Sequence, residues 1–490
     1  MTTALSPALG DLFPQTSSRV PVAGIASDSR AVRDGFVFVA VPGTKANGAA
    51  FIADALARGA AAIVGEVERP ATLFPEIPYI RVPDARRALA LGAARLHPGQ
   101  PDTVVAVTGT SGKSSVAEFC RQIFRNLGHH SASLGTLGII TGEGAQYGSL
   151  TTPDPITLHT QLDELAAGGI THLAMEASSH GISQRRLDGV RLAAAGFTNL
   201  GRDHLDYHES LEEYLEAKLR LFRELLPAGR PVVVNADGEA AARVMKAAHE
   251  HDHPVLTVGR GGTTLGLVSA KRQGFTQHLV VRVATESGRA LDVPVDLPLV
   301  GDFQAENALV AAGLVTASMP EHDRAAIVET LAGLAGVPGR LERIGEVRGA
   351  LCVVDYAHKP EALASVLDTL RPFATGRLVC VFGCGGDRDR GKRPLMGSIA
   401  AAKADTVIVT DDNPRTEVAA AIRAAILAAA PGAQEIGDRE DAIRFAVGSL
   451  ERGDVLVVAG KGHETGQIVG DHTLPFSDAD VLRAAMEDFA

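Results

Sequence analysis

The chain has 490 residues, of which 46% are hydrophobic and 21% charged, so it is long enough for about three domains with sizeable cores. Its 47 basic and 58 acidic side chains leave a net charge of −11 without a Lys/Arg cluster, which argues against a nucleic-acid partner. No stretch approaches the ~18 uninterrupted apolar residues of a membrane span, and residues 1–13 lack the pattern of a secretion signal. We expect a cytoplasmic protein with no membrane span and with its four cysteines reduced.

Residues 1–98 are predicted to form a small α/β domain. Residues 35–41 alternate like a short strand, whereas the Ala-rich stretches 53–62 and 85–96 favour helices. Residues 97–101 combine turn residues with helix breakers, so they mark a linker.

Residues 99–337 repeat the order of apolar strand, glycine loop and long helix, with apolar runs at 172–175, 193–198 and 231–234. This alternation predicts a central domain with a parallel sheet covered by helices. A second boundary is expected near residues 336–339, where Gly and Pro cluster.

Residues 338–490 are predicted to form a Rossmann-like domain, so the fold class is α/β with three domains. Apolar runs at 351–354, 378–382, 406–409 and 455–458 alternate with helical stretches such as 361–370 and 418–429. Each run ends in a polar or glycine-rich tip, at 355–358, 383–388, 410–413 and 459–464. Such tips line the ligand crevice of an open α/β sheet, although ordinary strand-to-helix turns also favour Gly, Asp and Asn. Four tips together favour a ligand site.

A phosphate-binding loop is predicted at residues 104–115, where a strand leads through glycines into a helix. Lys113 adds a positive charge, and Ser114 is placed to coordinate Mg²⁺. The usual motif has Gly at the position of Val107, so the match is incomplete. Its members are Thr108, Gly109, Thr110, Ser111, Gly112, Lys113, Ser114 and Ser115.

Two further strand ends place acids near histidines. Glu176 precedes His180, and Asp203, His204, Asp206 and His208 follow Asn199. Carboxylate and imidazole groups near a phosphate loop suit Mg²⁺, although solvated loops would contain the same residue types.

Lys218 interrupts the apolar stripe of the predicted helix 211–225, between Leu215 and Phe222. Its side chain either extends along the edge of the stripe to solvent or points inward with a function. The spacing alone leaves both open.

Taken in order, these motifs resemble the Mur ligases of peptidoglycan synthesis, from about residue 27 to the end. The resemblance is carried by Thr108-Gly109-Thr110-x-Gly112-Lys113, Thr151-Thr152-Pro153, Glu176-x-Ser178-Ser179-His180, Asn199-x3-Asp203-His204, Lys218, Gly339-Arg340-x-Glu342, Asp355-Tyr356-Ala357-His358, the Gly-Gly-Asp-Arg tip at 385–388, Asp412-Asn413-Pro414-Arg415 and Gly460-Lys461-Gly462-His463-Glu464. Ser111, Ser114-Ser115, Asn47-Gly48 and the segment 304–307 depart from the commoner family residues, and only the adenine contact of Asn307 is affected.

The resemblance implies an ATP-dependent amide ligase that adds meso-diaminopimelate to UDP-N-acetylmuramoyl-L-alanyl-D-glutamate through an acyl phosphate, releasing ADP and phosphate. It implies one Mg²⁺ held by Ser114 and Glu176 and a second served by His204 and a carbamylated Lys218, with Lys113, Glu176, His204 and Lys218 catalytic. ATP would contact the phosphate loop with Asn307, Arg340, Asp355 and His358. The nucleotide-linked dipeptide would contact Ser29, Thr151, Thr152, Ser178, Gln184 and Arg186, and diaminopimelate Arg388, Asp412, Asn413, Pro414, Arg415, Gly460 and Glu464.

Three small-molecule substrates would then be bound by a protein that we expect to be a monomer and to be open without them. A mechanical ATPase would share the phosphate loop but has no use for a second ligand site. A folylpolyglutamate synthase should lack the segments 151–153 and 412–415. A lysine-adding sister ligase is the nearest alternative.

Arg415 separates that alternative from diaminopimelate addition. We expect Asn413 to cap a helix and Pro414 to be its first residue, which puts Arg415 in the first turn at a cost of roughly 0.3–1 kcal/mol. An anionic ligand would offset that cost. Diaminopimelate has a carboxylate that lysine lacks, and a guanidinium can bind it through two hydrogen bonds.

Overall fold

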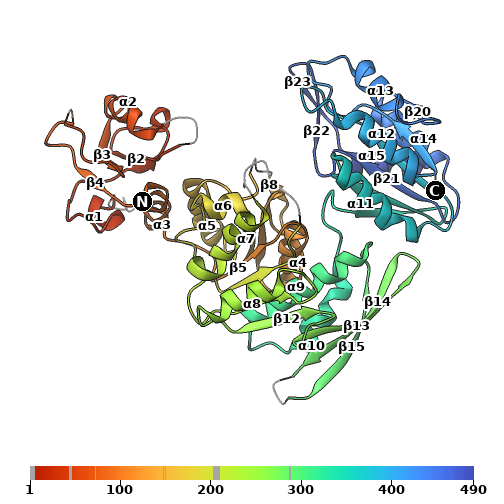
Figure 1. The fold of residues 1–490 in the computed structure, drawn as a ribbon, viewed down its shortest axis with the longest axis horizontal. Helices are drawn as coiled ribbons and strands as arrows, with labels where there is room; N and C mark the ends of the chain where they lie inside the picture. The colour runs from red at the N-terminus through yellow and green to blue at the C-terminus, as the bar shows by residue number, and fades with distance from the viewer. Residues whose placement is uncertain are drawn as a thin grey trace. The chain divides into compact units, whose positions relative to one another are not determined.

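The computed structural model describes residues 6–43, 47–71, 73–146, 148, 150–201, 210–285 and 288–489. Contacts divide the chain into two compact units, one of Met1–Gly266 with Val310–Ile327 and one of Leu267–Leu309 with Val328–Ala490. Both units combine helices with mostly parallel sheets, which confirms the predicted α/β class (Figure 1). Within the described ranges, no helix has the length and apolar character that crossing a membrane requires.

The first unit begins with a four-stranded parallel sheet in the order β1-β2-β3-β4. Alternation along β2 sends Val37 and Val39 to one apolar cluster and Phe38 to another, so both faces of the sheet are covered. The elements are α1 (Leu9–Leu12), β1 (Gly24–Ala26), η1 (Ser29–Ala31), β2 (Phe36–Ala40), η2 (Gly48–Phe51), α2 (Ile52–Ala57), β3 (Ala60–Gly65), β4 (Tyr79–Arg81) and α3 (Ala85–Leu96).

The larger sheet of the first unit runs in the order β12-β11-β10-β5-β9-β6-β7-β8, and its central strands are parallel. Apolar residues of α5, α7 and α8 pack against one face, while α4 packs against β5, β6 and β9. Asp154 caps α5 and Ser210 caps α7, which fixes where both helices begin. The elements are β5 (Thr103–Thr108), α4 (Lys113–Asn126), β6 (Ser131–Gly135), β7 (Gly138–Ile140), β8 (Ala145–Gln146), α5 (Pro155–Ala167), β9 (His172–Glu176), α6 (Ser179–Ser183), β10 (Ala194–Phe197), α7 (Leu211–Arg220), the π-helical turn η3 (Leu221–Leu225), β11 (Val232–Asn235), α8 (Ala241–His249) and β12 (Val255–Gly259).

The chain enters the second unit along β13 (Leu265–Gln273), whose neighbour β14 (Thr276–Ala284) pairs antiparallel with β15 (Ala290–Leu297). It then passes through α9 (Asp302–Ser318), α10 (Arg324–Glu329) and η4 (Thr330–Gly333). This antiparallel segment was not predicted from the sequence.

The C-terminal sheet has the order β16-β17-β21-β18-β19-β20 and is parallel except for β16. Helices α11, α12 and α13 cover one face through an apolar cluster, and α14 and α15 cover the other. Such a doubly wound sheet confirms the Rossmann-like prediction. The elements are β16 (Glu342–Val347), β17 (Ala350–Asp355), α11 (Pro360–Leu370), η5 (Arg371–Phe373), β18 (Leu378–Phe382), α12 (Lys392–Lys403), β19 (Thr406–Val409), α13 (Ala419–Leu427), β20 (Gln434–Glu435), α14 (Arg439–Gly448), β21 (Val455–Ala459), β22 (Gly466–Val469), β23 (His472–Pro475) and α15 (Asp478–Asp488).

One predicted helix is wrong in part. Residues 53–62 form the end of α2 and the start of β3, because Arg58 and Gly59 turn the chain and Ala60–Gly65 pair with β2. Alanine favours helices only weakly, so strand pairing decides its conformation. The division at residues 98 and 337 stays a prediction.

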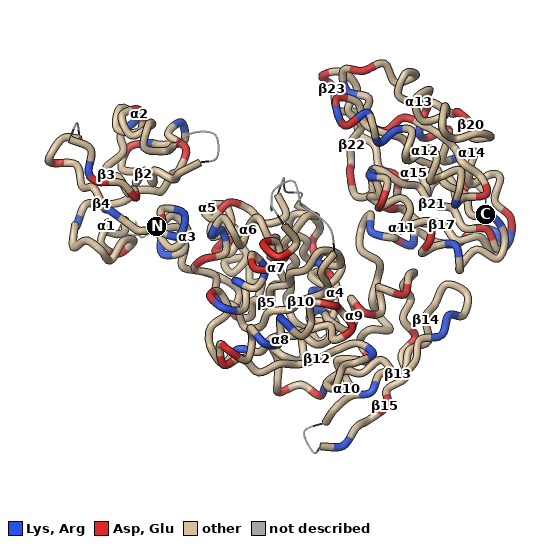
Figure 2. Tube along the Cα trace, in the orientation of Figure 1, with Lys and Arg blue, Asp and Glu red and all other residues tan. Residues whose placement is uncertain are grey.

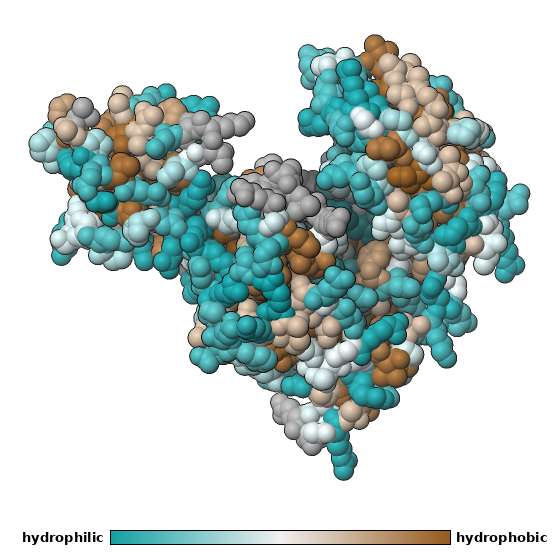
Figure 3. Space-filling model, viewed as in Figure 1, coloured by the Kyte–Doolittle hydropathy of each residue, from teal (hydrophilic) through white to brown (hydrophobic). Residues whose placement is uncertain are grey.

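Lys and Arg alternate with Asp and Glu along the described part of the chain, and neither sign gathers in one region of it (Figure 2). Hydrophilic residues dominate the face seen in Figure 3.

Candidate active site

The phosphate loop follows β5 and ends at the N terminus of α4. Gly109 has φ 148° and Gly112 has φ 85°, conformations that favour glycine, and a Cβ on Gly109 would lie 1.9 Å from Thr198 Oγ1. No side chain of the described chain caps α4, whose first residue is Lys113. The two residues that follow β10 bind the loop instead. The N–H of Ser111 donates to Asn199 Oδ1 at 3.0 Å, and Thr198 Oγ1 donates to Ser111 O at 2.7 Å. A rigid loop at an uncapped helix N terminus suits phosphate oxygens.

Two lysines converge on this loop. Lys113 Nζ donates to the carbonyl oxygens of Gly109 and Thr110 at 2.9 and 2.8 Å, and Lys218 Nζ donates to Gly109 O at 2.8 Å. Lys218 is 0% exposed and its Nζ lies 4.1 Å from the centre of the Tyr214 ring. The interpretation that Lys218 extends to solvent is therefore wrong, and its side chain points inward.

Glu176 ends β9 beside the loop, because β9 pairs with β5 in the register Val107↔Glu176. Its side chain is 2% exposed, and it accepts from the N–H of Thr136 at 2.7 Å and from Thr136 Oγ1 at 3.3 Å. A Cβ on Gly135 would overlap the carboxylate. These contacts fix a buried carboxylate next to the phosphate loop.

His204 lies outside the described residues, as do Asp203, Asp206 and His208. Among the residues that are described, no group of three His, Cys, Asp or Glu side chains could hold a metal ion. The metal-ligand prediction for His204 stays a prediction.

The segment 151–152 joins the turn after β9. Thr152 Oγ1 lies 3.0 Å from both Glu176 O and Ser178 Oγ, and Arg186 Nη1 donates to Thr152 O at 2.6 Å. Thr151 Oγ1 lies 3.0 Å from Thr136 Oγ1, and Arg186 also donates to Gln184 Oε1. The structure thus brings together five of the residues that are predicted to contact the dipeptide. Ser29 belongs to η1, where it is buried and its hydrogen bond lowers the pKa of Asp54.

In the second unit, Arg340, Asp355 and His358 meet where β17 ends. Asp355 accepts from the N–H groups of Leu341 and Ala357 at 2.7 and 2.8 Å, and burial raises its pKa to about 6. Tyr356 lies between Arg340 and His358, with its ring centre 5.2 and 4.5 Å from them. Asn307 is buried in α9, where its Nδ2 donates to Gln304.

The tips after β17, β21, β18 and β19 are neighbours because these strands are adjacent and parallel. Asn413 and Glu464 touch, since Asn413 Nδ2 donates to Glu464 Oε2 at 2.9 Å. Asp412 lies under Gly460, where a Cβ would come within 2.8 Å of Asp412 Oδ2. We call the residues 385–388, 412–415 and 460–464 the strand-tip cluster.

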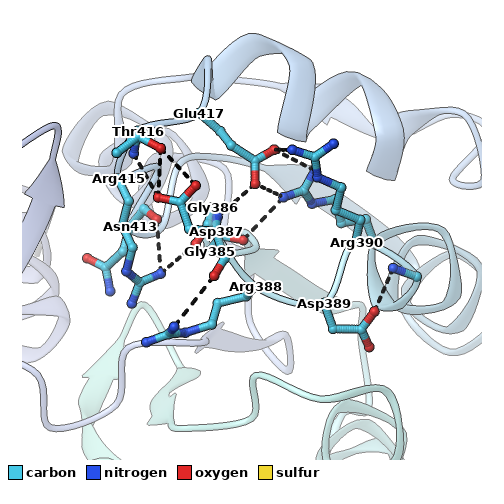
Figure 4. A network of polar contacts seen from close by, with 12 residues as sticks. Gly385, Gly386, Asp387, Arg388, Asp389, Arg390, Asn413, Arg415, Thr416 and Glu417 are labelled. Atoms are coloured by element: carbon cyan, nitrogen blue, oxygen red, sulfur yellow. Dashed lines mark hydrogen bonds and ion pairs between the residues drawn. The ribbon is translucent and has the colours of Figure 1, made fainter.

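Arg415 enters this cluster from a turn and not from a helix (Figure 4). The predicted helix start at Asn413 and Pro414 is wrong, because α13 begins at Ala419. Arg415 has φ 52°, and its backbone bonds Ile468 O and the N–H of Gly470 on the β22–β23 hairpin. The argument from the helix dipole therefore does not apply to Arg415.

The side chain of Arg415 keeps donors for a ligand. Its Nη1 donates to Gly386 O at 2.9 Å, whereas Nε and Nη2 have no acceptor among the described residues. Arg388 is exposed, and in the described part of the chain its guanidinium contacts Asp387 O at 3.5 Å. Figure 4 shows Asp387 turned to Thr416, which leaves both guanidinium groups without a carboxylate partner there.

Sequence reasoning missed two buried cations. Arg439, at the start of α14, pairs with Asp478 and donates to the carbonyl oxygens of Ala459 and Asp411. Lys461 is 0% exposed inside the strand-tip cluster. Lys461 belongs to a motif that the sequence analysis identified, but no role was assigned to it there. No sequence pattern around Arg439 indicated a function.

Three family models match the chain in sequence order. They are "Mur ligase family, catalytic domain" at residues 21–103, "Mur ligase middle domain" at 107–315 and "Mur ligase, glutamate ligase domain" at 339–462.

Individual proteins agree with these matches. The UDP-N-acetylmuramoyl-L-alanyl-D-glutamate–2,6-diaminopimelate ligase of Bradyrhizobium diazoefficiens is 56% identical over 469 residues, which are 95% of each chain. A solved structure of a ligase with the same name is 33% identical, with a TM-score of 0.73 and 99% of each chain covered. A folylpolyglutamate synthase from Mycobacterium tuberculosis, solved with ADP, has a TM-score of 0.59 at 18% identity over 76% of this chain and 92% of its own, and so shares the fold.

Proposed function

Because the chain belongs to the Mur ligase family, we propose that it is the ATP-dependent ligase that joins meso-diaminopimelate to UDP-N-acetylmuramoyl-L-alanyl-D-glutamate in peptidoglycan synthesis. The γ-phosphoryl group of ATP passes to the substrate carboxylate, giving an acyl phosphate and ADP. The amine of diaminopimelate then attacks the acyl carbon, loses a proton and displaces phosphate. The observation that carries the proposal is the meeting of Lys113, Lys218 and Glu176 at one phosphate loop.

Phosphoryl transfer needs positioning and charge stabilisation more than covalent chemistry from the protein. The N–H groups at the start of α4 bind phosphate oxygens, and the Lys113 ammonium moves from the loop carbonyls to the transferring phosphoryl group. Asn307, Arg340, Asp355 and His358 are the proposed contacts of ATP in the second unit. The pair Arg340 and Tyr356 supports this role, since an Arg beside an aromatic ring offers a planar surface to a base.

Ser114 and Glu176 fit a magnesium ion, because hydroxyl and buried carboxylate oxygens are the donors that Mg²⁺ prefers. When bound, Mg²⁺ would neutralise negative charge that develops on the phosphate oxygens. Thr136 keeps Glu176 in place for this task. His204 and Lys218 are the proposed ligands of a second ion.

Carbamylation of Lys218 is supported by the two ammonium groups that share the Gly109 carbonyl. Two cations at one oxygen repel each other in a buried site. The Lys218 ammonium first loses a proton, and the amine then reacts with carbon dioxide, which forms an N–C bond and releases a second proton, so that one of these cations becomes an anion. The repulsion then becomes attraction, and Lys218 offers oxygen ligands to a hard cation.

The dipeptide is proposed to lie along Thr151, Thr152, Ser178, Gln184 and Arg186, with Ser29 holding the nucleotide end. Diaminopimelate is proposed to lie on the strand-tip cluster, with its far carboxylate on Arg415 and its far ammonium on Glu464. The open Nε and Nη2 of Arg415 among the described residues support the first of these contacts. Arg388, Asp412, Asn413, Pro414 and Gly460 complete the proposed site.

We also propose that the protein acts as a cytoplasmic monomer with domains at residues 1–98, 99–337 and 338–490. The three family matches end and begin close to these boundaries, which supports the division.

The test is ADP release with the muramoyl dipeptide and a panel of amino acids. We expect turnover with meso-diaminopimelate and none with L-lysine, because a site built for a charged contact rejects the analogue lacking it by on the order of 10⁴-fold. ADP release without the dipeptide, or equal use of L-lysine, would overturn the proposal.

A further inference from the structure

Lys461 follows β21 in the strand-tip cluster and is 0% exposed, which is unusual for a lysine. A buried ammonium must be compensated by hydrogen bonds and opposite charge. Lys461 Nζ donates to Asn413 Oδ1 at 2.9 Å and to Glu464 Oε2 at 3.2 Å. Both partners are proposed to contact diaminopimelate, so Lys461 lies directly behind the residues that face the substrate.

These three side chains form a closed ring of hydrogen bonds. Asn413 Oδ1 accepts from Lys461 and from the N–H of Ile468 at 2.9 Å, so the amide oxygen faces two donors. The amide nitrogen therefore faces Glu464, and Nδ2 donates to Oε2 at 2.9 Å. The reverse amide orientation would set an NH₂ group against Lys461 and Ile468, so only one orientation is compatible with Lys461.

The ring leaves one side of Glu464 open. Its Oε2 accepts two hydrogen bonds, whereas Oε1 has no donor among the described residues. The Glu464 side chain is 35% exposed. The carboxylate is thus fixed through one oxygen, and its other oxygen can accept a hydrogen bond from an ammonium group of a ligand.

We propose that Lys461 is a positioning residue for the amino-acid substrate, holding the Asn413 amide and the Glu464 carboxylate in the orientation that receives the far end of diaminopimelate. The inference rests on the proposed function. Lys461 touches no substrate itself. It acts through its two neighbours, because one ammonium fixes both the direction of the amide and the place of the carboxylate.

The backbone of the two tips is held separately by Arg439. Its guanidinium donates to Ala459 O at 3.0 Å, just before Gly460, and to Asp411 O at 3.2 Å, just before Asp412. Its pairing with Asp478 is also fully buried. Loss of Lys461 should therefore release two side chains while the tips keep their backbone.

The test is Lys461→Met, which keeps an unbranched side chain that is one atom shorter and removes the ammonium. We expect the KM for diaminopimelate to rise at least ~10-fold, as for the loss of hydrogen bonds to a charged group, with the KM values for ATP and the dipeptide unchanged. The control is Lys403→Met, which removes an ion pair with Asp368 on the surface and should change none of these values.

The outcomes separate this inference from the proposed function. If the wild type releases no ADP with diaminopimelate, the proposed function fails and the role of Lys461 fails with it. If the wild type releases ADP with diaminopimelate, two results would overturn the inference alone. One is an unchanged KM for diaminopimelate in folded Lys461→Met, and the other is a joint rise of all three KM values. Should Lys461→Met not fold, Lys461→Gln decides, since it keeps an N–H donor without a buried charge. Its diaminopimelate KM should rise above the wild-type value while the KM values for ATP and the dipeptide stay unchanged, and no rise would overturn the inference.

Discussion

Lys113 and Lys218 both donate to one carbonyl group, that of Gly109, and they reach it from different elements. Lys113 is the first residue of α4, whereas Lys218 comes from α7. Each is proposed to carry a different part of the reaction, so each gives a separate prediction.

We predict that Lys113→Ala lowers the rate of ADP release at least ~100-fold, the effect of losing one group that stabilises the transition state. The Lys113 ammonium donates to carbonyl oxygens of the loop, so we expect the fold to remain. A substrate-dependent ADP assay and thermal unfolding measure the two effects. Arg125→Ala is the control, since Arg125 is an exposed cation in the last turn of the same helix. Near-normal turnover by folded Lys113→Ala would contradict the assignment.

For Lys218 we predict near-complete inactivity of both Lys218→Ala and Lys218→Arg, since neither can form the carbamate. Bicarbonate should rescue neither variant, whereas a small carboxylic acid should restore part of the activity of Lys218→Ala by replacing the anion. In the wild type, ¹³C-bicarbonate should give a carbamate signal by NMR that is lost in Lys218→Arg. Full activity of Lys218→Arg would show that a plain cation suffices.

At the scale of elements, the β22–β23 hairpin determines the conformation of Arg415. Its backbone forms a bridge with Val469, and φ of 52° is strained for a residue with a Cβ. Strain of this kind persists where surrounding structure imposes it, and it is common at ligand sites.

We predict that Arg415→Ala raises the KM for diaminopimelate at least ~10-fold, by the loss of a charge-assisted contact, and leaves the KM values for ATP and the dipeptide unchanged. Arg415→Lys should recover only part of the affinity, because an ammonium cannot make two parallel hydrogen bonds. Arg, Ala and Lys all have a Cβ, so the backbone strain at position 415 is the same in the wild type and in both variants. Differences in their steady-state kinetics therefore report the side chain alone. An unchanged KM in Arg415→Ala would remove Arg415 from the site.

The role of Arg415 at the ligand site stays a prediction, whereas the helix start from which it was argued in the sequence is wrong. Asn413 and Pro414 carry the local signature of a helix start, yet Asn413 bonds Lys461, Glu464 and Ile468 instead of capping a helix. These partners lie about fifty residues further along the chain, where local patterns carry no information about them. The four inner strands of the C-terminal sheet, β17, β21, β18 and β19, were predictable because buried parallel strands read as apolar runs, whereas the edge strands β16 and β20 were not predicted.

A histidine cluster joins the end of α4 to the start of β9. The ring centres of His129 and His172 are 4.1 Å apart, His322 lies 5.8 Å from His129, and Thr171 Oγ1 lies 2.9 Å from His172 Nδ1. The pKa of His172 is lowered to about 4, chiefly by burial and also by the neighbouring His129 and His322, while Asp102 and Glu321 oppose the change. His172 is therefore neutral in the folded protein at pH values where the unfolded chain is protonated.

We predict that the free energy of unfolding falls as pH drops from ~6.5 to about 4, because the unfolded chain then binds a proton that folded His172 does not. The loss from this group is at most about 3 kcal/mol, at ~1.4 kcal/mol per pKa unit. His172→Gln should flatten the pH dependence measured by urea unfolding, whereas His130→Gln, at an exposed position, should not. An identical pH dependence in wild type and His172→Gln would contradict this account.

At the scale of the whole molecule, the distribution of the cores bears on the domain division. The two apolar clusters that flank the C-terminal sheet come from residues 341–485, apart from Val300. By contrast, α9 runs from the second unit into the first, so residues near 300–320 serve both. A C-terminal fragment that begins after α9 would therefore keep nearly all residues of the two clusters that flank its sheet.

We therefore predict that residues 338–490 fold alone. The fragment keeps all six strands of its sheet and the helices on both faces, and it loses only Val300 from its two clusters. Apolar cores on both faces of a sheet are sufficient for a cooperative transition in a domain of this size. Circular dichroism should show one sigmoidal urea transition.

The matched control is the fragment 360–490, which lacks β16 and β17 and so exposes the edge of β21 and the inner faces of both clusters. It should unfold without cooperativity or aggregate. If both fragments behaved alike, β17 would not belong to the folding unit, and the boundary at residue 337 would be misplaced. If neither folded, the C-terminal sheet would depend on β13–β15, and residues 267–309 would have to be counted in the same domain.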